Sequence, residues 1–106
     1  MAGRVLWRRR AEEDLVEVHG HLEADSPAAA ERFLDAVERA VLFLLENPRA
    51  GWPRAFRSQR ARGVRSWPVR GFDASLIFDQ PVGRDLEIVR LLHGARDLRD
   101  LLEQDG

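Results

Sequence analysis

The sequence predicts an α+β fold in which a helical hairpin packs on a small antiparallel-type sheet, in the order βααβββ with a short C-terminal helical tail. Three observations predict it. A short β-prone run comes before two amphipathic stretches of helical period, a strong helix restart separates those stretches, and three β-like runs follow with turn residues between them. Such strands would not be stable alone, whereas a sheet covered on one face by a helical hairpin would be.

The first two elements are a strand and a helix. The run RVLWR at 4–8 is apolar and β-prone, which favours a short strand. From Arg9 onward, apolar residues recur at intervals of three and four and form one stripe on a helix, which we expect to end at about Ala24. The members of this stripe are Ala11, Leu15, Val18 and Leu22.

The second helix has clear signals at both ends. Ser26 is a good N-cap, Pro27 suits the first helical position, and Glu31 adds negative charge near the positive end of the helix. Asn47 and Pro48 end the helix, because proline disfavours helical conformation in the preceding residue. The short connection between the helices predicts an antiparallel hairpin. The apolar stripe consists of Ala30, Phe33, Leu34, Val37, Ala40, Val41, Leu44 and Leu45.

The second half of the chain is read as a loop, three strands and a tail. Residues 47–61 have no sustained period and predict a loop, whereas 61–71, 72–80 and 85–93 predict an antiparallel meander. Pro68 makes the first of these an edge strand or places a bulge in it. The tail at 97–105 predicts either a short helix or a segment that orders only against a partner. We expect Trp7, Phe33 and Phe78 to lie in the core.

Length and composition exclude several classes of protein. A chain of 106 residues supports one domain, residues 1–106. The absence of cysteine excludes disulfides and thiolate chemistry. There is no apolar run of about 20 residues and no signal-peptide core, so we expect a cytoplasmic protein without a membrane partner. There is no glycine-rich phosphate loop, and His19 and His21 lie about 200° apart around a helix, so we expect no cofactor and no metal.

The formal net charge of −1 hides a strong asymmetry. Residues 1–46 carry six arginines and ten acids, 47–72 carry seven arginines and no acid, and 73–106 carry four arginines and eight acids. The arginines of the middle segment alternate with Trp52, Phe56 and Trp67, a pattern that favours binding to phosphates or to an acidic protein. The alternative is a solvated loop and strand face. The candidate binding residues here are Arg54, Arg57, Arg60, Arg62 and Arg65.

Arg90 and His93 lie near the end of the last predicted strand. Strict alternation puts Arg90 on the same face as Ile88 and His93 on the other face, although the strand end could still bring both to one groove. Histidine can act there as a general acid or base, and arginine can stabilise phosphorane-like charge. The alternative is structural, with His93 ending the strand and Arg90 paired with Asp97 or Glu87.

The helical hairpin followed by ENPRAG, RGVRSWPV, SLIFD and EIVRLLHGARD resembles the ParE branch of the RelE/ParE toxins of bacterial type II toxin–antitoxin systems, over residues 4–98. The resemblance implies a compact βααβββ toxin. It also implies an antitoxin whose C-terminal segment wraps over the helices and lies against the sheet. ParE-type members poison DNA gyrase, whereas RelE-type members cleave mRNA in the ribosome.

Residue content favours the gyrase branch, because RelE-type sites often use a lysine and a late tyrosine and this chain has neither. We therefore expect a toxin that inhibits DNA gyrase without catalysis and is held by a cognate antitoxin, in a complex that could be a larger hetero-oligomer. One alternative is a ribosome-dependent mRNA endoribonuclease that uses Arg65, Arg90 and His93; another is an inactive antitoxin-binding member. The expected binding residues are Arg54, Arg57, Arg60, Arg62, Arg65, Arg90, His93, Arg96, Leu98, Leu101 and Leu102.

Overall fold

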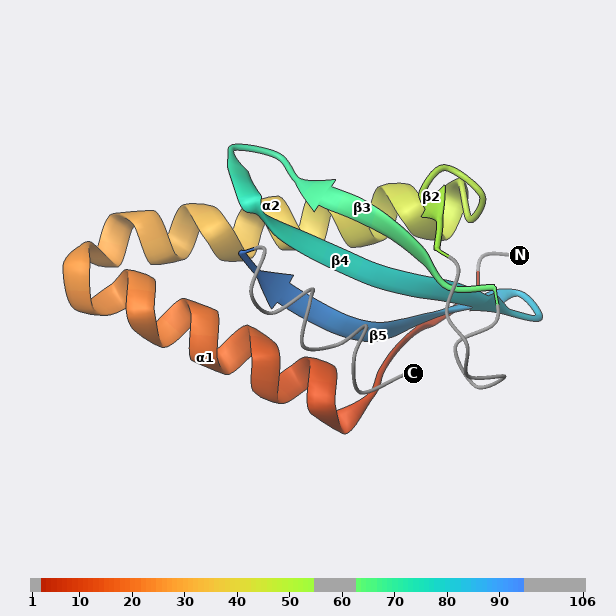
Figure 1. Ribbon diagram of the computed structural model, residues 1–106, viewed down its shortest axis with the longest axis horizontal. Coiled ribbons are helices and arrows are strands. Elements are labelled where there is room, and N and C mark those ends of the chain that lie inside the picture. Colours follow the sequence, from red (N-terminus) through yellow and green to blue (C-terminus); the bar gives the residue numbers. More distant parts are fainter. Residues whose placement is uncertain (1–2, 55–62, 95–106) are drawn as a thin grey trace.

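The computed structural model describes residues 3–54 and 63–94, and these form two layers. The elements are β1 (Val5–Trp7), α1 (Arg9–Asp25), α2 (Pro27–Glu46), β2 (Trp52–Pro53), β3 (Arg65–Val69), β4 (Phe72–Val82) and β5 (Asp85–His93). Both helices lie on one side of a twisted sheet (Figure 1). The predicted α+β fold and helical hairpin are confirmed, while the predicted tail at 97–105 lies outside the described residues.

Local signals account for the helix ends. The Ser26 hydroxyl accepts a hydrogen bond from the Ala29 amide at 3.2 Å, and Pro27 is the first residue of α2. At the other end, the Asn47 amide donates to the carbonyl of Phe43, after which Pro48 prevents another turn. The predicted N-cap and the predicted end of α2 are both confirmed.

The sheet has the strand order β1-β5-β4-β3-β2. The meander of β3, β4 and β5 is antiparallel, as predicted, but β1 pairs with β5 in parallel, so the whole sheet is mixed. The expected loop at 47–61 is wrong at Trp52 and Pro53, which pair with Ser66 and Arg65 as β2. Gly51 permits this pairing, because a Cβ there would lie 2.9 Å from the Cβ of Arg65.

Two irregularities interrupt the strand register. One lies between Pro68 and Val69, which confirms the predicted bulge; proline has no N–H to offer a neighbouring strand. The other lies on β5, where Phe78 faces Arg90 and the next residue of β4 faces Ile88, so that Val89 is an extra residue. Because side chains alternate along a strand, this extra residue reverses the facing of everything after it.

The main core fills the space between the helices and the sheet. Phe33 is fully buried in it and Trp7 packs against it, as predicted, and the fully buried Phe78 lies in a second, smaller cluster with Val64 and Leu92. Leu34 was expected in the apolar stripe but is 39% exposed, because it lies one residue beyond Phe33 at the rim of the stripe. The buried members of the main core are Ala11, Val18, Phe33, Val37, Ala40, Val41, Leu44, Val69, Ile77, Leu86, Ile88 and Leu91.

Within the described residues, no helix is long and apolar enough to cross a membrane.

Candidate functional site

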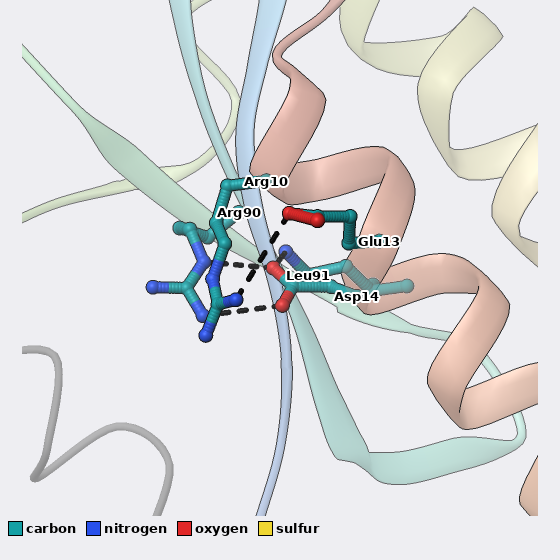
Figure 2. Close-up of polar contacts among 5 residues, drawn as sticks. All are labelled: Arg10, Glu13, Asp14, Arg90 and Leu91. Atoms are coloured by element: carbon teal, nitrogen blue, oxygen red, sulfur yellow. Dashed lines mark hydrogen bonds and ion pairs between the residues drawn. The ribbon is translucent and has the colours of Figure 1, made fainter.

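Arg90 is held by a carboxylate from α1. Its Nε donates to Oδ2 of Asp14 at 2.7 Å and its Nη2 donates to Oδ1 at 3.1 Å, while the Leu91 amide donates to Oδ2 at 3.0 Å. Figure 2 shows the guanidinium of Arg90 and the amide of Leu91 converging on Asp14, with the weaker pair of Arg10 and Glu13 beside them. The side chains of Arg90 and Asp14 are only 15% and 8% exposed. Asp14 therefore fixes α1 to β5 through both a side chain and the backbone.

This arrangement corrects two expectations about Arg90. The extra residue Val89 places Arg90 opposite Phe78, on the face of the sheet away from the helices, and not on the face of Ile88. The expected pair with Glu87 is also wrong, because Glu87 binds other partners; the alternative partner, Asp97, lies outside the described residues.

Glu87 instead accepts hydrogen bonds from Arg8 and Gln80, each at 2.7 Å. Burial alone would raise the pKa of Glu87, but the hydrogen bonds from Arg8 and Gln80 and the positive charge of Arg8 outweigh it and lower that pKa. Glu87 is therefore a charged link between β5 and the segment that joins β1 to α1.

His93 lies at the end of β5, across from Ser75 on β4. Its Nδ1 is 2.7 Å from the hydroxyl of Ser75, which is fully buried, whereas the His93 side chain is exposed. The Gly94 amide then donates to the carbonyl of Ala74. The ring therefore has a fixed orientation at the mouth of a cavity of about 270 Å³ that is lined by Asp14, Glu17, Val18, His21, Leu22, Leu91 and His93.

Arg65 lies on β3 and supports the turn that follows α2. Its Nη1 donates to the carbonyls of Gly51 at 3.1 Å and Arg49 at 3.4 Å. Its cross-strand neighbour Asp79 is fully buried, and neither carboxylate oxygen has a hydrogen-bond partner among the described residues. Burial raises the pKa of Asp79 to about 6, although the positive charge of Arg65 opposes this shift.

The three residues of the ribonuclease alternative are spread over the sheet. Arg65 faces Asp79 and His93 faces Ser75, two positions of β4 that are separated by four residues, or about 13 Å along a strand. Arg90 lies on the opposite face and is bound to Asp14. Within the described structure, Arg65 and His93 therefore lie apart on the sheet, and Arg90 is directed to Asp14.

Arg54 is the one other expected binding residue whose position is described. Its Nε donates to the hydroxyl of Ser66 at 2.7 Å, and its amide donates to the carbonyl of Val64. Arg54 is thus a structural link between the segment after β2 and the start of β3. The remaining expected residues, which lie outside the described part of the chain, are Arg57, Arg60, Arg62, Arg96, Leu98, Leu101 and Leu102.

Comparison with known proteins agrees with this fold. The family model for the ParE toxin of type II toxin–antitoxin systems (parDE) matches residues 5–98. The chain belongs to the ParE family. A curated protein of Sinorhizobium fredii (strain NBRC 101917 / NGR234), named "Putative toxin Y4kP", is 31% identical over 90 residues, which cover 85% of this chain and 86% of that protein.

A solved structure shares the same fold. It is described as a chromosomal ParDE TA system from P. aeruginosa, and it matches with a TM-score of 0.71 and 21% sequence identity. The match covers 88% of this chain and 97% of that chain. The helical hairpin and the mixed sheet are therefore an architecture that this ParE-family chain shares with a distant structural neighbour.

The residues that sequence reasoning missed are Asp14, Ser75 and Asp79. Only Asp14 carried a usable signal, because it lies three residues after Ala11 and four before Val18 and so falls within the apolar stripe of α1. An acid in a buried stripe requires a buried partner.

Within the described part of this ParE-family chain, no group of three or more histidine, cysteine, aspartate or glutamate side chains could hold a metal ion.

Proposed function

We propose that this ParE-family chain is a toxin that inhibits DNA gyrase by binding and that a cognate antitoxin protein neutralises it. The choice of target rests on the hydrogen bonds that Arg90 and His93 make within the protein. Arg90 forms a bidentate ion pair with Asp14, and His93 is hydrogen-bonded to Ser75. A toxin that acts by binding needs no reactive constellation, so these internal contacts are compatible with gyrase inhibition.

The same contacts oppose the ribonuclease alternative. A ribonuclease needs an acid or base and a cation within reach of one phosphate. Arg90 would have to leave Asp14, and breaking a buried ion pair costs about 3–5 kcal/mol, because a charge is left without its partner. Gyrase inhibition requires no such rearrangement, and it also places the site of action in the cytoplasm.

The test compares two activities of one purified preparation. Relaxed plasmid, ATP and purified gyrase are incubated with the chain, and programmed ribosomes with bound mRNA are treated in parallel. We expect supercoiling to stop while the mRNA stays intact. Cut mRNA with active gyrase, together with loss of cutting in His93→Ala, would establish the ribonuclease alternative. If neither activity is seen while a tight antitoxin complex still forms, the chain is an inactive member.

The antitoxin partner is supported by family membership and by the structural match, which is described as a ParDE TA system. We expect co-expression of the chain with its cognate antitoxin to relieve growth inhibition and to yield a stable hetero-oligomer. Light scattering of the purified complex measures its mass and hence its stoichiometry. Unchanged growth inhibition during co-expression would contradict this part of the proposal.

A further inference from the structure

Asp79 lies on β4, the middle strand of the sheet, on the face that packs against the helices. Its cross-strand neighbours are Arg65 on β3 and Ile88 on β5, and Ile88 belongs to the main core. The Asp79 side chain is fully buried, yet neither of its carboxylate oxygens has a hydrogen-bond partner among the described residues. Buried polar groups without partners are rare in folded proteins, because nothing replaces their lost hydration. Asp79 therefore requires an explanation.

Arg65 is the charged neighbour that acts on Asp79, but its hydrogen bonds go elsewhere. Its Nη1 donates to the carbonyls of Gly51 at 3.1 Å and Arg49 at 3.4 Å. Residues that face each other on antiparallel strands have Cβ atoms about 4.5–5.5 Å apart, so the long arginine side chain can also reach the carboxyl group opposite. Arg65 thus lies between two sets of acceptors, the carbonyls of the turn after α2 and the carboxyl group of Asp79.

The other elements packed against this face contribute no further charge among the described side chains. The buried residues of α2 are all apolar, and the one buried acid of α1, Asp14, is bound to Arg90. β1 and β2 contain no titratable side chain. Glu87 on β5 lies on the opposite face, because it comes one residue before the core residue Ile88. Arg65 is therefore the cation that responds to the charge on Asp79.

The two protonation states of Asp79 place different demands on Arg65. A neutral carboxyl group needs no cation, so Arg65 can hold the two carbonyls, as observed. An ionised carboxylate that is buried without a partner is costly, and arginine binds a carboxylate more strongly than a carbonyl because both partners are then charged. Loss of the Asp79 proton to water therefore favours movement of the guanidinium from the carbonyls to the carboxylate.

We propose that Asp79 and Arg65 form a pH-sensitive switch that controls how firmly the turn after α2 and the adjoining strand β2 are held. With Asp79 protonated, Arg65 fixes the turn through the carbonyls of Arg49 and Gly51. With Asp79 ionised, Arg65 binds the carboxylate and releases the turn. Burial raises the pKa of Asp79 to about 6, which places the change between acid and neutral conditions.

β2 is sensitive to this change because little else attaches it. It lies at the edge of the sheet beside the start of β3 and pairs there through two residues (Figure 1). The first of these, Trp52, is 60% exposed and stacks on Trp67 with ring centroids 5.7 Å apart. Trp52 also follows Gly51 directly, so release of the Gly51 carbonyl acts on it at once. The switch therefore alters an exposed aromatic surface while the core of the sheet stays intact.

The test is an NMR titration of the isotope-labelled chain between about pH 4.5 and about pH 7.5. We expect the amide signals of Ala50, Gly51 and Trp52 to shift in one transition. Its midpoint should equal that of the Asp79 carboxyl carbon and lie well above 3.8, the ordinary pKa of aspartate. Asp79→Asn should keep these amide signals at their acid positions at every pH, because its side chain cannot ionise.

Two further variants separate the switch from a general effect of pH. Arg65→Gln removes the responding cation, so it should abolish the transition at residues 50–52 and raise the pKa of Asp79 further. Glu87→Gln is the matched control, a carboxylate of the neighbouring strand on the opposite face, and it should leave the transition unchanged. The three histidines titrate in a similar range but remain in Asp79→Asn, so they cannot cause a difference between that variant and the unaltered chain.

Two results would overturn the proposal. One is a transition at residues 50–52 that persists in Asp79→Asn, and the other is titration of Asp79 without any shift at those residues. The second result is measured on the unaltered chain, so it decides the matter even if a variant does not fold. The assay contains only this chain, so its outcome is independent of the tests of gyrase inhibition and antitoxin binding.

Discussion

Asp14 makes a polar link between α1 and β5, beside the apolar core that also packs this helix on the sheet. It accepts two hydrogen bonds from Arg90 and one from the Leu91 amide, and it is almost fully buried. A buried ion pair of this kind adds little net stability when it is intact, since both charges lose hydration. Its importance appears when one partner is removed, because the other charge then remains buried without compensation.

We expect Asp14→Asn to lower the free energy of unfolding by about 3–5 kcal/mol. Urea titration followed by circular dichroism measures this change. The matched control is Glu13→Gln, one position earlier, whose exposed pair with Arg10 spans 4.0 Å and should contribute less than about 1 kcal/mol. Similar losses in the two variants would show that the pair of Asp14 and Arg90 is no more important than a surface contact.

Asp79 should make stability depend on pH in the direction opposite to most carboxylates. Its pKa rises from 3.8 to about 6 in the folded protein, so folding favours the neutral form. The associated stability is fully present below about pH 3.8 and is lost as the pH rises through about 6. At pH 7.5 the charged form therefore costs up to about 3 kcal/mol.

The variant Asp79→Asn keeps the shape of the side chain and removes its charge. We expect it to be more stable than the unaltered chain at pH 7.5 and close to it at pH 4. Thermal unfolding at both pH values measures the difference, and titration of Glu87 cancels because it is present in both proteins. A stability gain of equal size at both pH values would contradict the role assigned to the charge.

At the scale of elements, Gly51 and Gly20 differ in whether the surrounding structure has room for a Cβ atom. A Cβ at Gly51 would lie 2.9 Å from the Cβ of Arg65 and 3.0 Å from the carbonyl oxygen of Ser66. A Cβ at Gly20, inside α1, would meet nothing within 4 Å. The first glycine is required for β2 to approach β3, whereas the second weakens its helix without any packing benefit.

We therefore expect Gly51→Ala to destabilise the protein by about 1–3 kcal/mol through overpacking. Gly20→Ala should stabilise it by about 0.5–1 kcal/mol, because alanine is the better helix former. Thermal unfolding of the two variants side by side provides the measurement. The idea fails if both substitutions shift the melting temperature in the same direction.

Elements with local signals could be predicted from the sequence, and those set by distant contacts could not. Ser26, Pro27 and Pro48 determine the ends of α2 through their own backbone chemistry, so its bounds followed from the sequence. The extra residue Val89 depends on how β5 meets β4, and no feature of β5 alone reveals it. The facing of Arg90 was therefore predicted wrongly, and its partner Asp14, 76 positions away, was missed.

At the scale of the whole molecule, the sheet should differ in stability from centre to edge. β4 pairs with β3 and β5 over most of its length, whereas β2 contributes only Trp52 and Pro53 at one edge. We expect the Ile77 amide to exchange its hydrogen far more slowly than the Trp52 amide, since protection follows burial and pairing. Hydrogen exchange measured by NMR tests this; equal protection would mean that the sheet opens only as a unit.

The place of β5 in the sheet affects the order in which the chain can fold. β5 lies between β1 and β4, and Asp14 and Arg8 also make their main contacts with it. Until residues 85–93 have left the ribosome, β1 has no strand to pair with and α1 has no partner for its buried acid. We expect the growing polypeptide to stay incompletely folded until β5 has been synthesised, so that any toxic activity that needs the complete sheet arises only after that point.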